Sequence, residues 1–115
     1  MADDPAPRRV QLQRLAGWRM PEHTKKVARP TRWGNPWAAT WQPGVGWCCM
    51  ETGTGFLIPA RDQADAHDLA VAHYRRWIEP QAEAVRAELR GWNLACFCQP
   101  SLPCHADVLL ELANA

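Results

Sequence analysis

Residues 91–114 read GWNLACFCQPSLPCHADVLLELAN and decide the expected fold of this 115-residue chain. The apolar run at Asn93–Cys98, set between a glycine and a proline, is typical of a buried strand. A loop over Gln99–Pro103 follows, and Ser101 or Pro103 can open a helix. That helix carries apolar residues at spacings of three and four, namely Val108, Leu109 and Leu112. The stretch therefore predicts a strand, a short loop and a helix.

This strand–loop–helix unit gathers three of the five cysteines beside a histidine. Side chains alternate along a strand, so Cys96 and Cys98 should face the same way. Cys104 and His105 should lie in the first turn of the helix. In open α/β sheets, ligands bind outside the carboxyl ends of the strands, which is where these side chains meet. We therefore expect a Cys/His-centred site there.

Metal binding is the first of three interpretations of this cluster. Cys98, Cys104 and His105 are ligand types that zinc uses, and Cys96 is a less favoured further ligand. The spacing C-x-C-x5-C-H differs from the paired C-x2–4-C spacing of most structural zinc sites. Zinc is accordingly the candidate cofactor, and the sequence indicates no other.

Covalent catalysis is the second interpretation. A helix N-terminus and a neighbouring imidazole both favour a thiolate, so Cys104 or Cys98 can act as a nucleophile. His105 would serve as base, and Asp107 would either orient the imidazole or, as acidic residues more often do there, cap the helix. The predicted catalytic group is thus Cys104, His105 and Asp107. In the third interpretation, Cys96 and Cys98 are simply small buried core residues.

The charge of the chain is unevenly distributed although the formal net charge is only +1. Residues 1–37 hold eight Lys/Arg against three Asp/Glu, a balance of +5, and the remainder holds five against nine, a balance of −4. Five of the seven tryptophans lie between Trp18 and Trp47. A basic, Trp-rich first third predicts a phosphate-bearing partner, either a small molecule or a nucleic acid.

Membrane insertion and export are not expected from the sequence. No apolar run approaches the roughly 20 residues that a membrane span needs, and the N-terminus, MADDPAPRR, lacks the apolar core of a signal peptide. We therefore predict a cytoplasmic protein whose cysteines are thiols, metal ligands or catalysts rather than a disulfide framework.

The stretch RPTRWGNPW at residues 29–37 predicts a tightly specified loop, because Gly34 and Asn35 tolerate turn dihedrals and Pro36 restricts the residue before it. An arginine beside a tryptophan can hold a phosphate while the indole stacks on a base. The predicted ligand-binding residues are Arg19, Arg32 and Asn35.

The rest of the chain predicts an α/β domain over residues 9–115, after a disordered tail at residues 1–8. Strands are expected at 9–14, 26–28, 47–50 and 55–58, and helices at 62–79 and 80–90, with Asp62 as a helix cap. The sheet is flanked by helices, with a long N-terminal loop, an inserted β-hairpin at 47–58, and the first and last strands adjacent and central. On the first helix, the expected inward face is Ala66, Leu69, Ala70, His73 and Trp77. Trp92 is expected in the core, and His67 in solvent.

With these residues in view, the chain resembles a small phage and bacterial family classed as a domain of unknown function (number forty-three twenty-six). The motifs that carry the resemblance span residues 9–114 and are RVQLQR…GWRMPE, VARPTRWGNPW, YRRW and LRGWNLACFC…PCHADVLLELAN. Members usually connect the second and third motifs by a shorter segment than Ala38–Ala60, which here carries Trp47, Cys48 and Cys49. The resemblance brings no activity with it. Phage membership favours nucleotide or nucleic-acid chemistry by analogy.

Two functions follow as hypotheses. The first is an enzyme acting on a nucleotide or modified nucleobase, with Arg19 and Arg32 holding phosphate and the Cys/His cluster holding zinc or performing catalysis. The second is a non-enzymatic nucleic-acid-binding module with structural, zinc-bound or metal-free cysteines. In either case Arg32 should approach His105 across a single cleft.

Overall fold

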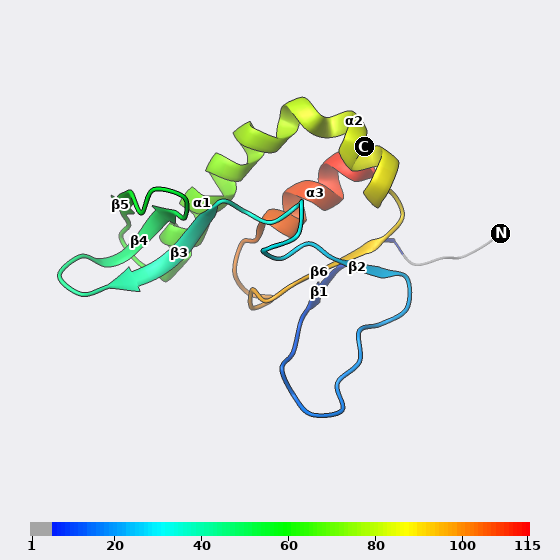
Figure 1. The fold of residues 1–115 in the computed structure, drawn as a ribbon, viewed down its shortest axis with the longest axis horizontal. Coiled ribbons are helices and arrows are strands. Elements are labelled where there is room, and N and C mark those ends of the chain that lie inside the picture. The colour runs from blue at the N-terminus through cyan, green and yellow to red at the C-terminus, as the bar shows by residue number, and fades with distance from the viewer. Residues whose placement is uncertain (1–5) are drawn as a thin grey trace.

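Two small sheets and three helices make up the computed structural model, which describes residues 6–115 (Figure 1). The parallel sheet has the order β1-β6-β2, formed by Arg9–Gln11, Asn93–Cys96 and Thr24–Lys26. The antiparallel sheet has the order β3-β4-β5, formed by Trp37–Gln42, Gly46–Glu51 and Leu57–Pro59. The predicted α/β class is thereby confirmed.

The strand predicted at residues 93–98 is β6, which ends at Cys96. It lies in the middle of the parallel sheet, and its residues Leu94, Ala95 and Cys96 are all buried. β1 lies next to it, as predicted, and pairs with it in parallel, but it is an edge strand rather than a central one. β2 takes the other side and lies two residues before the expected position.

The antiparallel sheet contains the predicted hairpin as β4 and β5. β3, which pairs with β4 along its whole length, was not predicted. Five of its six residues are half-buried and one is exposed, so the strand shows no alternation between buried and exposed positions for a sequence pattern to detect. Helix α1 packs against both β3 and β4 and joins this sheet to the rest of the molecule (Figure 1).

Helix α1 (Gln63–Ile78) begins after Asp62, whose carboxylate accepts a hydrogen bond from the Asp65 N–H at 2.8 Å, as predicted. The predicted inward face was partly wrong. Trp77 is 39% exposed. Trp92, which precedes β6 and was also expected in the core, packs against the core but is only partly buried. The buried residues of this helix are Ala66, Ala70, Tyr74 and Ile78.

Tyr74, and not the predicted Trp77, is the large aromatic residue on the buried face of α1. Its hydroxyl donates to the backbone carbonyl of Trp33 at 2.7 Å, so the only polar atom of the buried side chain is satisfied. The Tyr74→Phe variant should lower the free energy of unfolding by about 1–2 kcal/mol, because it leaves that carbonyl without a partner. Urea unfolding of the two proteins measures this difference, and an unchanged stability would mean that water replaces the hydroxyl.

The second predicted helix is α2 (Ala82–Leu89), preceded by a 3₁₀ turn at Glu79–Gln81. Its inward residues are Val85 and Leu89, as predicted, and Gly91 follows with φ of 83°, a conformation that favours glycine. Helix α3 (His105–Ala113) starts later than Ser101 or Pro103, with Cys104 as its N-cap. The three helices lie together above the parallel sheet in Figure 1, and α3 packs on α1, α2, β1 and β6.

Of the tail predicted at residues 1–8, residues 1–5 lie outside the described part of the chain. Within residues 6–115, none of the helices is long and apolar enough to span a lipid bilayer.

Candidate functional site: a cysteine triad on the wall of a cationic cavity

Three cysteines converge where β6 ends and α3 begins. Cys96 is the last residue of β6, Cys98 lies in the loop that follows, and Cys104 is the N-cap of α3. Their sulfur atoms all lie within 4.8 Å of one another, and the Cys96 and Cys104 sulfurs are 2.8 Å apart. All five cysteines of the chain are free thiols. The strand–loop–helix turn therefore builds a three-thiol cluster that could hold a metal ion.

The size of this triad suits zinc. Zn–S bonds of about 2.3 Å at tetrahedral angles place two sulfur ligands about 3.8 Å apart. All three sulfurs lie within 4.8 Å of one another, and the Cys96 and Cys104 sulfurs, now 2.8 Å apart, would have to separate by about 1 Å to reach that spacing. The structure groups Cys96 with Cys98 and Cys104, although the sequence favoured His105 over Cys96.

The three thiols differ in how readily they lose a proton. Hydrogen bonding from Cys104 and Cys96 outweighs burial and holds the pKa of the Cys98 thiol well below its usual range, and His67 lowers it further. Hydrogen bonding to Cys96 and Cys98 raises the pKa of the Cys104 thiol. One thiolate supported by neighbouring thiols is a starting point for metal binding, which requires deprotonated sulfur.

His105 lies beneath the triad with both ring nitrogens engaged. Its Nε2 lies 2.8 Å from the carbonyl oxygen of Val27, and its Nδ1 lies 3.5 Å from the Cys104 sulfur. A carbonyl can only accept a hydrogen bond, so Nε2 carries the proton and Nδ1 presents a lone pair towards the sulfur. Burial lowers the pKa of His105, which favours this neutral form. Such a histidine can orient a donor at the triad or accept a proton there.

Asp107 takes the capping role, which was one of its two expected roles. Its Oδ2 accepts from the backbone N–H of Cys104 at 3.2 Å and lies 2.8 Å from the Arg9 guanidinium. It thereby fixes the first turn of α3 and, with it, the position of Cys104.

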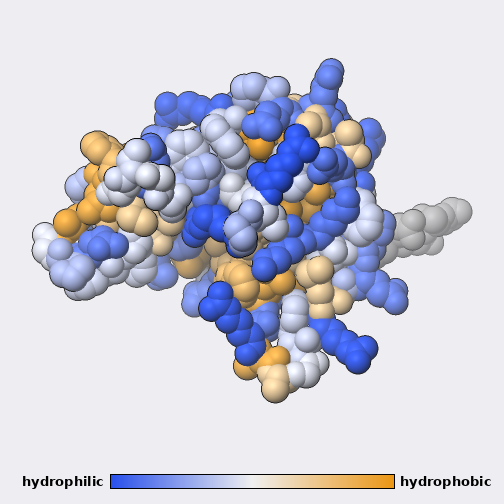
Figure 2. All heavy atoms as spheres, in the orientation of Figure 1, coloured by the Kyte–Doolittle hydropathy of each residue, from blue (hydrophilic) through white to orange (hydrophobic). Residues whose placement is uncertain are grey.

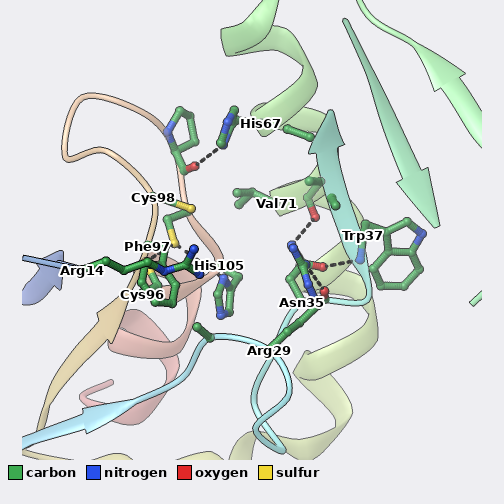
Figure 3. Close-up of a pocket in the computed structure, with 16 residues that line it drawn as sticks. Arg14, Arg29, Asn35, Trp37, His67, Val71, Cys96, Phe97, Cys98 and His105 are labelled. Atoms are coloured by element: carbon green, nitrogen blue, oxygen red, sulfur yellow. Dashed lines mark hydrogen bonds between the residues drawn. The ribbon is translucent and has the colours of Figure 1, made fainter. Parts of the chain in front are cut away.

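A cavity of about 390 Å³ opens beside the triad (Figure 3). Its lining combines all three cysteines and His105 with two arginines, Arg14 and Arg29, and with His67 from α1. Among residues 6–115, no aspartate or glutamate lines it and neither arginine forms an ion pair. The remaining lining residues are mostly apolar: Ala28, Asn35, Trp37, Ala38, Ala39, Ala70, Val71, Phe97 and Pro103.

The loop at residues 29–37 forms part of this cavity, but through a different arginine from the one predicted. Arg29 lines the cavity, and its Nη1 donates to the Asn35 carbonyl at 2.6 Å. Arg32 does not line it. Its guanidinium pairs with Glu88 at 2.8 Å and lies 4.4 Å from the ring centroid of Trp33. The expected approach of Arg32 to His105 was therefore wrong, because the turn at Gly34 brings residues 29 and 35 together and leaves residue 32 outside.

Two other predicted ligand residues have different environments. Asn35 lines the cavity but is buried, its amide donating to the Ala70 carbonyl and its oxygen accepting from the Trp37 N–H. It therefore holds the loop against α1 and β3. Arg19 is exposed and is not among the residues that line the cavity.

The sequence interpretation missed Arg14 and His67. Arg14 stacks on Phe97, with 4.4 Å between its guanidinium carbon and the ring centroid. His67 was expected in solvent, but it lines the cavity, and its Nδ1 lies 3.2 Å from the Pro103 carbonyl. A single histidine on a helix gives no sequence signal for such a contact, since it depends on how α1 packs against a loop 36 residues away.

Comparison with known proteins gives a family but no relative of known activity. No curated protein and no solved structure matches the chain. A model for a domain of unknown function (DUF4326) matches residues 10–115, nearly the whole chain and both walls of the cavity. The chain therefore belongs to the DUF4326 family.

Proposed function

We propose that this protein is a zinc enzyme that acts on a nucleotide or a modified nucleobase in the cavity beside the cysteine triad. One observation carries the proposal. The three converging sulfurs lie on the wall of a cavity that also presents Arg14 and Arg29 and contains no carboxylate. This combination suits an anionic ligand placed next to a metal ion.

The residues that line the cavity indicate which part of a nucleotide each group would hold. Arg14 and Arg29 supply planar groups that can each hold a phosphate oxygen pair, while the apolar residues from β3 and α1 receive a base. Cys96, Cys98 and Cys104 would leave a bound zinc one coordination position for water or substrate, and a zinc held in this way would supply an activated water for attack on a nucleobase ring. The lone pair on His105 Nδ1, 3.5 Å from the Cys104 sulfur, then lies close enough to accept a proton in that region.

A second candidate function requires His105 Nδ1 to move closer to the triad, since among residues 6–115 only the three sulfurs form the group of ligand atoms within 4.8 Å of one another. If His105 Nδ1 is itself the fourth zinc ligand, the metal is coordinatively saturated and serves to hold β6 and α3 together. The protein would then bind its phosphate-bearing ligand without metal chemistry. Co²⁺ substitution separates the two candidates, because adding a nucleotide or azide changes the visible spectrum of an open site and leaves that of a saturated site unchanged.

The arginine assignment has a matched test within a single loop. Arg29→Ala should weaken binding of a nucleoside monophosphate about 10-fold or more, as expected when a charge-assisted hydrogen bond is lost. Arg32→Ala should leave this affinity unchanged, because Arg32 pairs with Glu88 outside the cavity. Isothermal titration calorimetry measures both. Equal losses in the two variants, or no loss in either, would contradict phosphate binding by Arg29.

A further inference from the structure

The lining of the cavity includes an exposed aromatic ring that contacts two cations. Phe97 lies between Cys96 and Cys98 in the sequence, lines the cavity and is 39% exposed. The Arg14 guanidinium carbon lies 4.4 Å from its ring centroid, and the Lys26 Nζ lies 5.7 Å from it. These cations come from the loop after β1 and from the end of β2. A base that stacks on Phe97 would therefore have positively charged groups nearby for its phosphates.

Several basic side chains of the cavity lining, β2 and the β1–β2 loop have no carboxylate partner in the described part of the chain. Within the described residues, Arg14, Lys26 and Arg29 form no ion pair, and the exposed Arg19 lies on the same β1–β2 loop. This loop also exposes apolar side chains, with Leu15 69% and Met20 40% exposed. Figure 2 shows strongly hydrophilic and hydrophobic side chains side by side over the loop at the bottom of the view. Surfaces that follow a single-stranded polynucleotide combine positive charge along its backbone with aromatic side chains on which bases stack, a role that Phe97 could take here.

We infer that the base enters the cavity from a single-stranded nucleic acid, whose phosphates lie along the β1–β2 loop and β2 and whose neighbouring base stacks on Phe97. The inference rests on the proposed function and names its substrate class. A single strand fits better than a duplex, because the triad lies inside a cavity that a base can reach only outside the helical stack. A base on Phe97 would displace one of its two cations, which then becomes available to the adjacent phosphate.

Salt-dependent binding of fluorescently labelled oligonucleotides tests the electrostatic part. For a single strand, each phosphate contact contributes about 0.7 to the slope of log affinity against log salt. We expect a short single-stranded DNA or RNA to bind the full chain, and Lys26→Ala to reduce the slope by about 0.7. Arg76→Ala, which removes an exposed cation from the last turn of α1, is the control and should leave the slope unchanged.

Stacking is tested at Phe97 itself. Phe97→Leu keeps an apolar side chain but removes the aromatic face, and should weaken oligonucleotide binding about 10-fold, whereas Phe97→Trp should retain it. Phe56→Leu alters another exposed aromatic residue, 67% exposed before β5, and should have no effect.

Equal affinity for single strands and duplex, or equal effects of the Phe97 and Phe56 variants, would overturn the inference. If a nucleoside monophosphate binds through Arg29 but no oligonucleotide binds, only the single-strand inference fails. If neither ligand binds, both this inference and the proposed function fail.

Discussion

Replacing Cys98 with alanine should abolish zinc binding and lower the free energy of unfolding by roughly 3 kcal/mol or more, because metal-binding energy is also folding energy. Cys98 is the member of the triad best suited to this test. It is only half-buried, whereas Cys96 and Cys104 are almost fully buried. Its loss therefore removes a ligand with little loss of packing. Denaturant unfolding with added zinc and with a chelator measures the effect.

Cys49→Ala provides the control. Cys49 is fully buried in β4, outside the triad, and burial raises the pKa of its thiol. Removing its sulfur should cost about 1 kcal/mol, as for a small buried group, and should leave zinc binding intact. Two results together would contradict the account: Cys98→Ala destabilises the protein no more than Cys49→Ala does, and the chelator changes the stability of neither variant.

The Gly34→Ala variant should lose both stability and ligand affinity. A Cβ at position 34 would lie 2.9 Å from the Arg29 Cα and 3.0 Å from the Arg29 backbone nitrogen. These are backbone atoms, so the loop itself must move. We expect a loss of about 2 kcal/mol or more in the free energy of unfolding, as for other substitutions that create strain. Because Arg29 moves with the loop, nucleoside monophosphate binding should weaken by about as much as in Arg29→Ala, roughly 10-fold.

Gly53→Ala is the matched control for this prediction. An added Cβ at Gly53 meets nothing within 4 Å, and the backbone there has no positive φ. Chemical unfolding and calorimetric titration of the two variants give the comparison. Similar behaviour of both would mean that the loop tolerates a side chain at position 34 and that Gly34 does not position Arg29.

Local chemistry made the last third of the chain predictable. The strand, loop and helix at residues 93–113 follow from apolar periodicity and from punctuation by glycine and proline, and β6 and α3 occupy this stretch. The capping roles of Asp62 and Asp107 also follow from chemistry within a few residues. These features need no knowledge of distant contacts.

Residues whose roles depend on tertiary packing could not be assigned from the sequence. Arg29 and Arg32 lie in the same motif, and only the close approach of Gly34 to the Arg29 backbone decides which of them lines the cavity. Likewise, Cys96 joins the triad because the end of β6 lies against the N-cap of α3. His105 turns its Nε2 towards Val27, 78 residues away in the sequence.

The connection at residues 38–60 contains most of the antiparallel sheet. Cys48 and Cys49 are fully buried in its central strand and do not line the cavity. Ala38 and Ala39 of β3 do line it. This segment therefore contributes apolar residues to the cavity lining, which its sequence did not indicate.

The central claim is that Cys96, Cys98 and Cys104 hold a metal ion on the wall of the cavity. Elemental analysis of the purified full chain tests it most directly. We predict one zinc per chain, bound tightly enough to survive gel filtration. Adding a chelator should remove the zinc, and the protein should then lose its cooperative unfolding transition. A metal-free protein that stays fully folded in chelator, with three thiols that react slowly, would contradict the claim. The three cysteines would then be buried core residues without a metal-binding role.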